Sequence, residues 1–309
     1  MPKVQTLGLS FLYNQDKFDQ PLDLPELTAV DDYFLYIYDP DKTGTMNSPI
    51  SMPKVQSIGS SFLRYQEKFN QKLDLPQVTS VGNYFLRMRE GHSRFASMNS
   101  PILMPKVQTI GMDFMLGQLK FNQEINFLEL ISIEENALRL EWEDAELTSM
   151  NSPINLPKVQ TIGSSFMSNQ YKFNQPLNLP ELTSVGNGFL ALSETPLGGN
   201  MNSPISVPKL SVSGGNFLTY QTKFNQPLNF PALTSIGTIL IEGRNYTSTI
   251  TVPANLIYSN PFAGSLASSN ASSPCYVQGV KISGAGAAEF MAKHPNSSTG
   301  TWRRKLIRA

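Results

Sequence analysis

The sequence predicts a β-rich solenoid, a chain wound into stacked coils that share one core. Two observations lead to this prediction. The stretch Met1-Pro-Lys-Val-Gln-Thr returns, slightly altered, at Met52, Met104, Leu156 and Val207, so that it recurs every 51 or 52 residues. Each of these periods also divides into two related halves. Because one coil cannot bury its apolar side alone, repetition at this period indicates coils that stack on one another.

The two halves of a period share one frame and differ in length. Residues 156–178 read LPKVQTIGSSFMSNQYKFNQPLN, and residues 179–206 read LPELTSVGNGFLALSETPLGGNMNSPIS. The frame predicts about ten to eleven coils, in which a plain coil of about 23 residues alternates with a lengthened coil of about 28 residues. In the plain coils a glycine follows isoleucine, and we expect a tight bend with positive φ at Gly59, Gly111 and Gly163.

Alternating apolar and polar residues at the end of each half predict a short β-strand. Leu177 and Leu179 flank Asn178, which is the two-residue period of a strand, and Pro180 then removes a hydrogen-bond donor. Stacking these strands predicts a parallel sheet on one face of the solenoid. The side chains expected to point inward in this repeat are Phe173, Leu177, Leu179, Leu182, Val185 and Phe189.

The repeat decays towards the C-terminus, which predicts two parts of the chain. Residues 1–253 form the expected solenoid, and residues 254–309 form the expected C-terminal cap of β-structure and helix. Within the cap we expect a last strand over 276–282 and a short helix over 285–293. The basic residues of the tail are interpreted as solvated, and they are Arg303, Arg304, Lys305 and Arg308.

We expect the N-terminal end of the solenoid to be open. Met1 occupies the repeat position that Met52 and Met104 occupy in later coils, with no distinct capping unit before it. An uncapped end exposes strand edges and core. This predicts a preceding segment or a docked partner, including self-association within a larger assembly.

The recurring pattern Leu-Pro-x-Leu-Thr-Ser-x-Gly-x-x-Phe-Leu, followed by Phe-Asn-Gln-Pro-Leu, resembles the BspA-like class of leucine-rich repeats. The resemblance spans residues 1–253 in register. Members of the class usually carry a cysteine after the Phe-Leu pair, whereas the single cysteine of this chain is Cys275. The resemblance implies a leucine-rich repeat fold and a surface protein of bacteria, some protists or phages that acts in adhesion and protein binding. It identifies no ligand.

Charge and composition narrow the class of partner. The chain has 24 basic and 24 acidic side chains and no net charge, which disfavours nucleic acid and anionic membranes as partners. It has no apolar run of about 18 residues, so we expect no membrane span. The two histidines, His92 and His294, lie far apart in the sequence, so we expect neither a metal site nor a cofactor.

The extra residues of the lengthened coils fall at one point of the frame, so they are predicted to line one edge of the solenoid. Inserts of this kind often form a binding face, where aromatic and arginine side chains are the usual anchors. The alternative is that these inserts vary only because they are exposed. The candidate binding residues on this edge are Tyr36, Tyr38, Arg89, His92, Arg94, Phe95, Trp142 and Glu143.

The second candidate surface is the row of outward residues on the closing strands. This row is polar and slightly acidic, so we expect either a ligand-binding sheet or ordinary solvent-facing polarity with an Asn/Ser ladder that helps the coils to stack. The candidate binding residues in this row are Asp23, Asp74, Asn126, Asn155 and Asn178.

Catalytic motifs are weak in this sequence. Asp41-Lys-Thr-Gly-Thr45 matches the phosphorylated loop of cation pumps, but it lies inside an insert and without the domains that this chemistry needs. We therefore predict no enzyme but a surface-exposed binding or adhesion module for a protein or a glycan, located at the cell surface or outside the cell. The alternative is a structural component of a virion, fibre or surface layer that docks through its N-terminal end.

Overall fold

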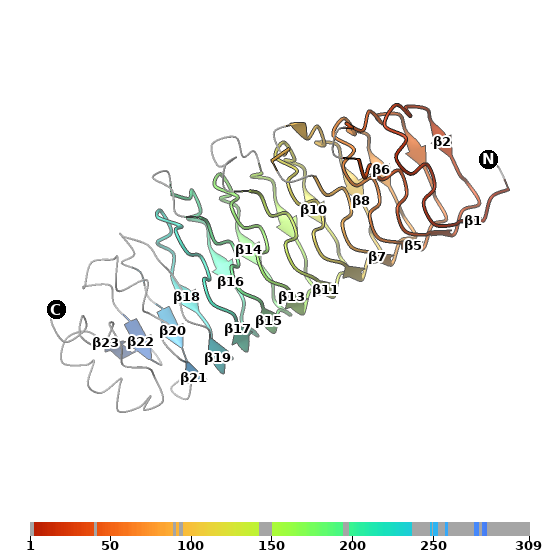
Figure 1. Ribbon diagram of the computed structural model, residues 1–309. Helices are drawn as coiled ribbons and strands as arrows, with labels where there is room; N and C mark the ends of the chain where they lie inside the picture. Colours follow the sequence, from red (N-terminus) through yellow and green to blue (C-terminus); the bar gives the residue numbers. More distant parts are fainter. Residues whose placement is uncertain are drawn as a thin grey trace. The chain divides into compact units, whose positions relative to one another are not determined.

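The computed structural model divides the chain into two compact units, Met1–Val159 (unit 1) and Gln160–Ala309 (unit 2). Within each unit, successive coils stack through short parallel strands, which confirms a β-solenoid-like fold (Figure 1). The described part of the chain contains no helix. The structure describes residues 3–39, 42–88, 91–92, 95–141, 150–193, 198–236, 248, 250–252, 257–258, 275–277 and 280–282.

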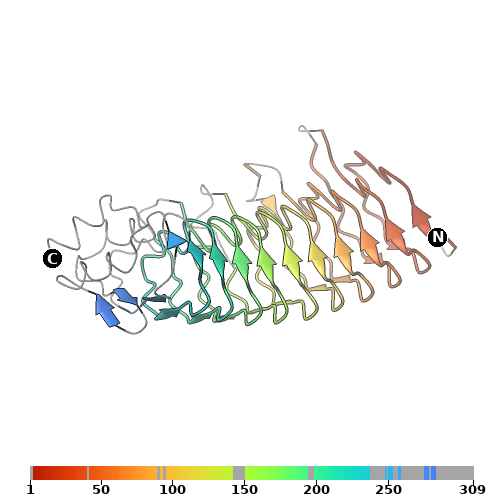
Figure 2. The ribbon, with the colours of Figure 1, turned by 90° about the horizontal axis from the view of Figure 1, so that it is seen from below.

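Two rows of two-residue strands run through unit 1. In the first row each strand pairs with its equivalent in the next coil, and this gives a continuous parallel sheet (Figure 2). In the second row the strands pair only two by two, β2 with β4, β6 with β8 and β10 with β12. The first row consists of β1 (Thr6–Leu7), β3 (Ala29–Val30), β5 (Ser57–Ile58), β7 (Ser80–Val81), β9 (Thr109–Ile110) and β11 (Ser132–Ile133). The second row consists of β2 (Leu22–Asp23), β4 (Ile50–Ser51), β6 (Leu73–Asp74), β8 (Ile102–Leu103), β10 (Ile125–Asn126) and β12 (Ile154–Asn155).

Unit 2 also has one continuous row of strands, whereas its other strands form one two-stranded sheet and one four-stranded sheet that ends in a hairpin. Its continuous row consists of β13 (Thr161–Ile162), β15 (Ser184–Val185), β17 (Val212–Ser213), β19 (Ser235–Ile236) and β21 (Ile257–Tyr258). Its other strands are β14 (Leu177–Asn178), β16 (Ile205–Ser206), β18 (Leu228–Asn229), β20 (Ile250–Val252), β22 (Cys275–Val277) and β23 (Val280–Ile282). β22 and β23 pair antiparallel, where the sequence predicted one strand over 276–282. The predicted helix over 285–293 and the basic tail lie outside the described residues.

The continuous sheet lies on a different stretch of the coil from the predicted one. The closing strands do form, as β14 shows, but they do not build the continuous sheet. Prolines flank the closing strands, as Pro101 and Pro105 flank β8, and the carbonyl of Pro101 accepts a hydrogen bond from the N–H of Leu73 within the pair β6–β8. The Thr/Ser–Ile/Val pairs of the first row have no proline and are joined from coil to coil.

Phenylalanine rings stack along the core of each unit. In unit 1 the ring centroids of Phe34 and Phe62 lie 5.0 Å apart, and those of Phe62 and Phe85 lie 5.2 Å apart. In unit 2 the rings of Phe189 and Phe217 stack at 4.9 Å. The six side chains predicted to point inward over 173–189 are all buried, which confirms that part of the repeat frame.

One coil of unit 1 replaces the stacked phenylalanine with Ala137. The apolar residue that opens this coil is Phe127 instead of leucine, and its ring meets Phe114 edge-on, with centroids 6.2 Å apart. Both Ala137 and Phe127 are buried. The two exchanges therefore compensate each other, because the ring of Phe127 supplies apolar volume beside Phe114 that the phenylalanine column loses at Ala137.

The Phe-Leu segment of each coil alternates between right-handed and left-handed backbone. In the plain coil that contains Phe62, the residues with positive φ are Ser61, Leu63 and Tyr65. In the lengthened coil that follows, they are only Tyr84 and Leu86. In the lengthened coils the alternation therefore ends one positive-φ residue earlier than in the plain coils. The extra residues of the lengthened coils begin at this point.

The glycines after isoleucine do not take the positive φ that the sequence predicted for Gly59, Gly111 and Gly163. Close approach between coils explains these glycines instead. A Cβ atom on Gly59 would lie 2.7 Å from the carbonyl carbon of Asp31 and 2.8 Å from the backbone nitrogen of Asp32. A Cβ on Gly111 would meet the preceding coil at similar distances. Glycine is needed because backbones touch at this point, and not because φ is unusual.

Asparagine side chains join the coils on the outside of each unit. In unit 1 the Oδ1 atoms of Asn47, Asn70 and Asn99 each accept a hydrogen bond from the backbone N–H of the equivalent residue in the next coil, at 2.7–2.8 Å. In unit 2 Asn174 and Asn202 do the same. The sequence predicted a stacking ladder on the closing strands. The structure places the repeated side-chain-to-backbone ladder in the Phe-Asn-Gln and Met-Asn-Ser motifs that precede them.

Candidate functional site: a tyrosine–arginine surface in unit 1

Two columns of residues flank the stacked phenylalanines at the start of unit 1. The residue before each phenylalanine has positive φ, and the residue after the Phe-Leu pair is tyrosine or arginine in the first four coils. At the equivalent positions, unit 2 carries the small residues Ser168, Ala191 and Thr219. The large side chains of these columns and their neighbours form what we call the tyrosine–arginine surface, made of Tyr13, Tyr33, Tyr36, Tyr38, Arg64, Tyr65, Tyr84 and Arg87.

The tyrosine rings of this surface contact one another across coils. Tyr13 lies edge-on to Tyr36, with centroids 5.5 Å apart, and stacks on Tyr38 at 6.4 Å. Tyr33 stacks on Tyr36 at 5.7 Å, and Tyr65 meets Tyr36 edge-on at 5.6 Å. Tyr36 is therefore the centre of the cluster, and it is buried with 6% of its surface exposed. Around it, Tyr33 is 39% exposed and Tyr38 is 64% exposed. The cluster therefore presents flat aromatic faces that are already packed in place.

Two arginines, Arg64 and Arg87, lie over tyrosine rings of this surface. The guanidinium carbon of Arg64 lies 4.4–5.0 Å from the ring centroids of Tyr36, Tyr65 and Tyr84. Arg87 lies 5.6 Å from the ring of Tyr84 and 5.9 Å from that of Tyr65. Both arginines donate to the Tyr65 hydroxyl oxygen at 2.8 Å. These are cation–π distances, so the rings hold both positive charges against the surface.

Of the two arginines, Arg87 is paired with a carboxylate, whereas Arg64 has no carboxylate partner among the described residues. The Nε atom of Arg87 lies 2.7 Å from Oδ2 of Asp113, a carboxylate that is itself largely buried. Within the part of the chain that the structure describes, Arg64 has no carboxylate within 4.0 Å. Burial raises the pKa of the Tyr36 hydroxyl above its usual value, while the Arg64 charge acts in the opposite direction. The Tyr36 hydroxyl is therefore neutral at neutral pH, and Arg64 contributes a positive charge without a carboxylate partner among the described residues.

The backbone beneath this surface is engaged in bonds between coils. The N–H of Tyr33 donates to the carbonyl of Ser60 at 2.8 Å, and the N–H of Tyr65 donates to the carbonyl of Arg87 at 2.9 Å. These bonds fix the position of each side chain relative to the next coil. These backbone groups already have partners, so the side chains are the groups of this surface that are available for contacts.

The residues that the sequence predicted on the insert edge lie in different environments. Tyr38 and Phe95 are exposed, as a binding role requires, but Tyr36 is buried and supports its neighbours instead of contacting a partner directly. His92 contacts a plain coil, with Nδ1 2.8 Å from Oε1 of Glu67. Two inserts also meet, because the N–H of Gly91 donates to Oε2 of Glu141 at 2.7 Å. The remaining predicted residues lie outside the described residues, and they are Arg89, Arg94, Trp142 and Glu143.

The predicted row on the closing strands is exposed throughout, at Asp23, Asp74, Asn126, Asn155 and Asn178. In unit 1, Asn155 donates to Oδ1 of Asn126 at 2.9 Å across the pair β10–β12. Asp74 pairs at 2.9 Å with Lys72, the residue that directly precedes β6. The row therefore consists partly of residues that stabilise one another.

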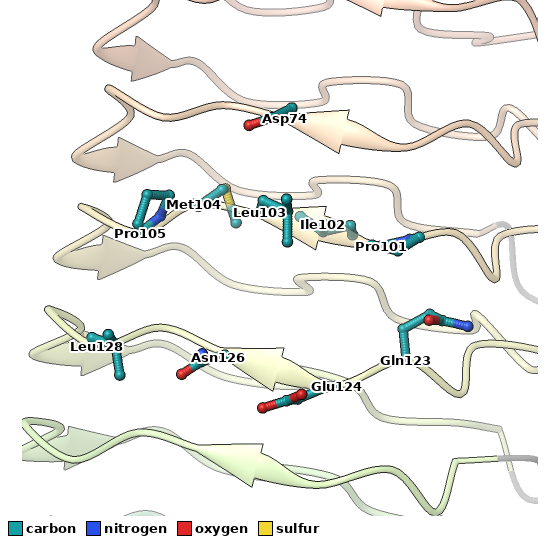
Figure 3. A pocket seen from close by; sticks show the side chains of 10 residues that line it. All are labelled: Asp74, Pro101, Ile102, Leu103, Met104, Pro105, Gln123, Glu124, Asn126 and Leu128. Carbon is teal, nitrogen blue, oxygen red and sulfur yellow. The ribbon is translucent and has the colours of Figure 1, made fainter.

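Adjacent strands of this row that do not pair leave clefts between them. β8 and β10 do not pair, and between them lies a cleft of about 440 Å³ (Figure 3). Leu103 and Leu128 line it with 42% and 43% of their surfaces exposed, and Asp74, Glu124 and Asn126 add polar groups. A smaller cleft of about 310 Å³ involves Asp74 again. This makes the row a second candidate contact surface, whose clefts are lined by both apolar and polar side chains.

The pattern of inserts does not reveal most of the tyrosine–arginine surface, because Tyr13, Tyr33, Arg64, Tyr65 and Tyr84 belong to the constant frame of the coils. An alignment of the coils one above another shows the signal. The frame position after the Phe-Leu pair holds tyrosine or arginine in each of the first four coils and a small residue in unit 2, and the position before phenylalanine is tyrosine in two of those four coils.

Comparisons with known proteins do not assign this surface. No protein-family model, no curated protein and no solved structure matches the chain. The resemblance to BspA-like leucine-rich repeats therefore stays a prediction from the sequence. Among the residues that the structure describes, no group of three or more acidic, histidine or cysteine side chains is arranged to hold a metal ion. None of the described segments is a helix with the length and hydropathy of a membrane span.

Proposed function

We propose that this chain is a recognition module that binds a protein or a glycan through the tyrosine–arginine surface and acts by binding, not by catalysis. The observation that supports the proposal is the concentration of six tyrosines and two arginines on four successive coils. Tyrosine and arginine are the residues that most often dominate binding energy at interfaces. In keeping with the family resemblance, the proposed location is the cell surface or the extracellular space.

The packing of the surface favours recognition for an energetic reason. Tyr33 and Tyr38 are exposed, yet their rings rest on Tyr36 and Tyr13. A side chain that is held in place before binding loses less conformational entropy when a partner arrives. The coils themselves are fixed by backbone hydrogen bonds, so the spacing of the rings is fixed as well.

The proposal is tested with the double variant Tyr33→Ser/Tyr38→Ser. The full chain and the variant are applied to an array of extracellular proteins and an array of glycans, and affinities are measured for every positive spot. We expect the variant to bind at least tenfold more weakly, because it removes the two most exposed rings and leaves the core intact. The matched control is Leu9→Ser, which removes an apolar side chain that is 68% exposed elsewhere in unit 1.

Two outcomes would redirect the proposal. Unchanged binding by the double variant, together with loss of binding by Leu103→Ser, would move the site to the cleft between β8 and β10. The structural alternative, a component of a virion, fibre or surface layer, predicts self-association. Light scattering that shows a concentration-dependent assembly, with no array partner, would favour it over recognition of another molecule.

A further inference from the structure

We infer that Arg64 is an anion-binding subsite within the tyrosine–arginine surface, and that its ligand is an acidic glycan whose carboxylate or sulfate pairs with the guanidinium while a sugar ring stacks on the exposed tyrosines. This inference rests on the proposed function and names the chemical class of its ligand.

The charge of Arg64 has no ionic partner in the described part of the chain. Its polar side-chain contacts are a hydrogen bond to the Tyr65 hydroxyl at 2.8 Å and a long one to the Ser61 hydroxyl at 3.5 Å. Its Nε atom is buried and makes no hydrogen bond. A half-buried guanidinium has lost part of its hydration, and three tyrosine rings replace only some of that stabilisation.

Arg87, the equivalent residue one coil later, differs from Arg64 in having an ionic partner. Arg87 touches two of the same rings but is neutralised by Asp113 at 2.7 Å. The carboxylate arises from the coil after Arg87, at the position before phenylalanine. In the coil after Arg64, that position is Tyr84, which stacks under the guanidinium and has no charge. An anion from a ligand would give Arg64 the ionic partner that Asp113 gives Arg87.

The groups that this surface offers favour a sugar over an extended peptide as the molecule that carries the anion. The backbone of this surface is hydrogen-bonded between coils, so it offers no row of free donors to an extended peptide. The surface offers flat aromatic faces at Tyr33 and Tyr38, and one cation over the ring of Tyr36, which both of these tyrosines contact. A pyranose ring stacks its C–H face on an aromatic ring, whose face carries negative charge density. A sugar that carries a carboxylate or sulfate therefore matches both elements of the surface.

The test compares four probes of similar length: a sulfated hexasaccharide, a uronic-acid hexasaccharide, a neutral hexasaccharide and a hexaglutamate peptide. Titration calorimetry with the full chain is expected to show at least tenfold tighter binding of one acidic saccharide than of the neutral saccharide or the peptide. Affinity is expected to fall with added salt, since part of it is ionic. The source of the anion follows from which acidic saccharide binds more tightly.

Three variants assign the effect to Arg64. Arg64→Gln is expected to lower affinity for the acidic saccharide at least tenfold and to remove most of its salt dependence. Arg64→Lys keeps the charge but loses the planar fork of the guanidinium. Its affinity for the acidic saccharide is expected to lie between those of the parent chain and Arg64→Gln. Lys54→Gln removes an exposed, ion-paired cation on the same unit and is expected to change affinity less than twofold. Thermal unfolding of each variant checks that the coils remain folded.

Several results would overturn the inference. Equal affinity for neutral and acidic saccharides, tighter binding of the peptide, or unchanged binding by a folded Arg64→Gln variant would each do so. The proposed function fails separately. If an array partner depends on Tyr33 and Tyr38 while no acidic saccharide binds, the inference is wrong and the recognition surface stands. If no partner depends on these tyrosines, the proposed function is wrong as well.

Discussion

The exchange of Phe127 and Ala137 offers a sharp test of how the core specifies its packing. Ala137→Phe restores the ring that the other coils of the column carry, but the ring of Phe127 already packs beside Phe114. Both positions are 1% exposed, so neither side chain can swing into solvent. Overpacking of this kind costs about 1–3 kcal/mol. Phe127→Leu alone removes part of a buried ring and costs about 1–2 kcal/mol, less than the roughly 3–5 kcal/mol of a full truncation to alanine.

The double variant Phe127→Leu/Ala137→Phe recreates the frame of the neighbouring coils. We expect it to lose about 1 kcal/mol or less, which gives a favourable coupling energy of about 2 kcal/mol, within the range for residues that share a packing site. Urea unfolding followed by circular dichroism measures each variant, with the midpoint compared at a common slope. Leu75→Phe is the matched control, because its coil already carries Phe85 and should be overpacked by about 1–3 kcal/mol. If the double variant loses the sum of the single losses to within about 0.5 kcal/mol, the compensation argument is refuted.

Three further predictions address contacts between the coils. Gly59→Ala is expected to destabilise unit 1 by about 1–3 kcal/mol, because its Cβ would lie within 2.8 Å of backbone, whereas Gly8→Ala, with nothing within 4 Å of its Cβ, should be neutral in the same urea assay. Asn99→Ala removes an acceptor that lies 2.8 Å from a backbone N–H of the next coil and should cost about 1 kcal/mol, whereas a loss indistinguishable from zero would deny the ladder a stabilising role. Hydrogen bonds from Asn47 and Ser48 lower the pKa of Asp19 below 3.8, so its contribution is complete above 3.8 and disappears as the pH falls through the lowered value. Asp19→Asn keeps an acceptor and should unfold with a weaker acid dependence than the parent chain, which parallel pH titrations would detect.

The repeat made much of the architecture predictable. Five occurrences of one motif and two coil lengths were sufficient to predict stacked coils, a parallel sheet and the inward side chains over 173–189. The location of the sheet was not predictable from alternation alone. The closing strands and the Thr/Ser–Ile/Val pairs both alternate, and only the structure shows which of them pairs through every coil.

The sequence by itself determined the period, the alternation of plain and lengthened coils and the apolar frame, because stacking requires each coil to repeat the same side chains. Only the tertiary structure decided that glycines are required by contact between backbones, that the asparagine ladder lies before the closing strands, and that tyrosines from separate coils meet around Arg64. The physical reason is distance. Tyr36, Arg64 and Tyr84 are separated by 20 or more residues in the chain but lie one coil apart in space. A sequence pattern shows that coils repeat, and the structure shows which side chains face each other across them.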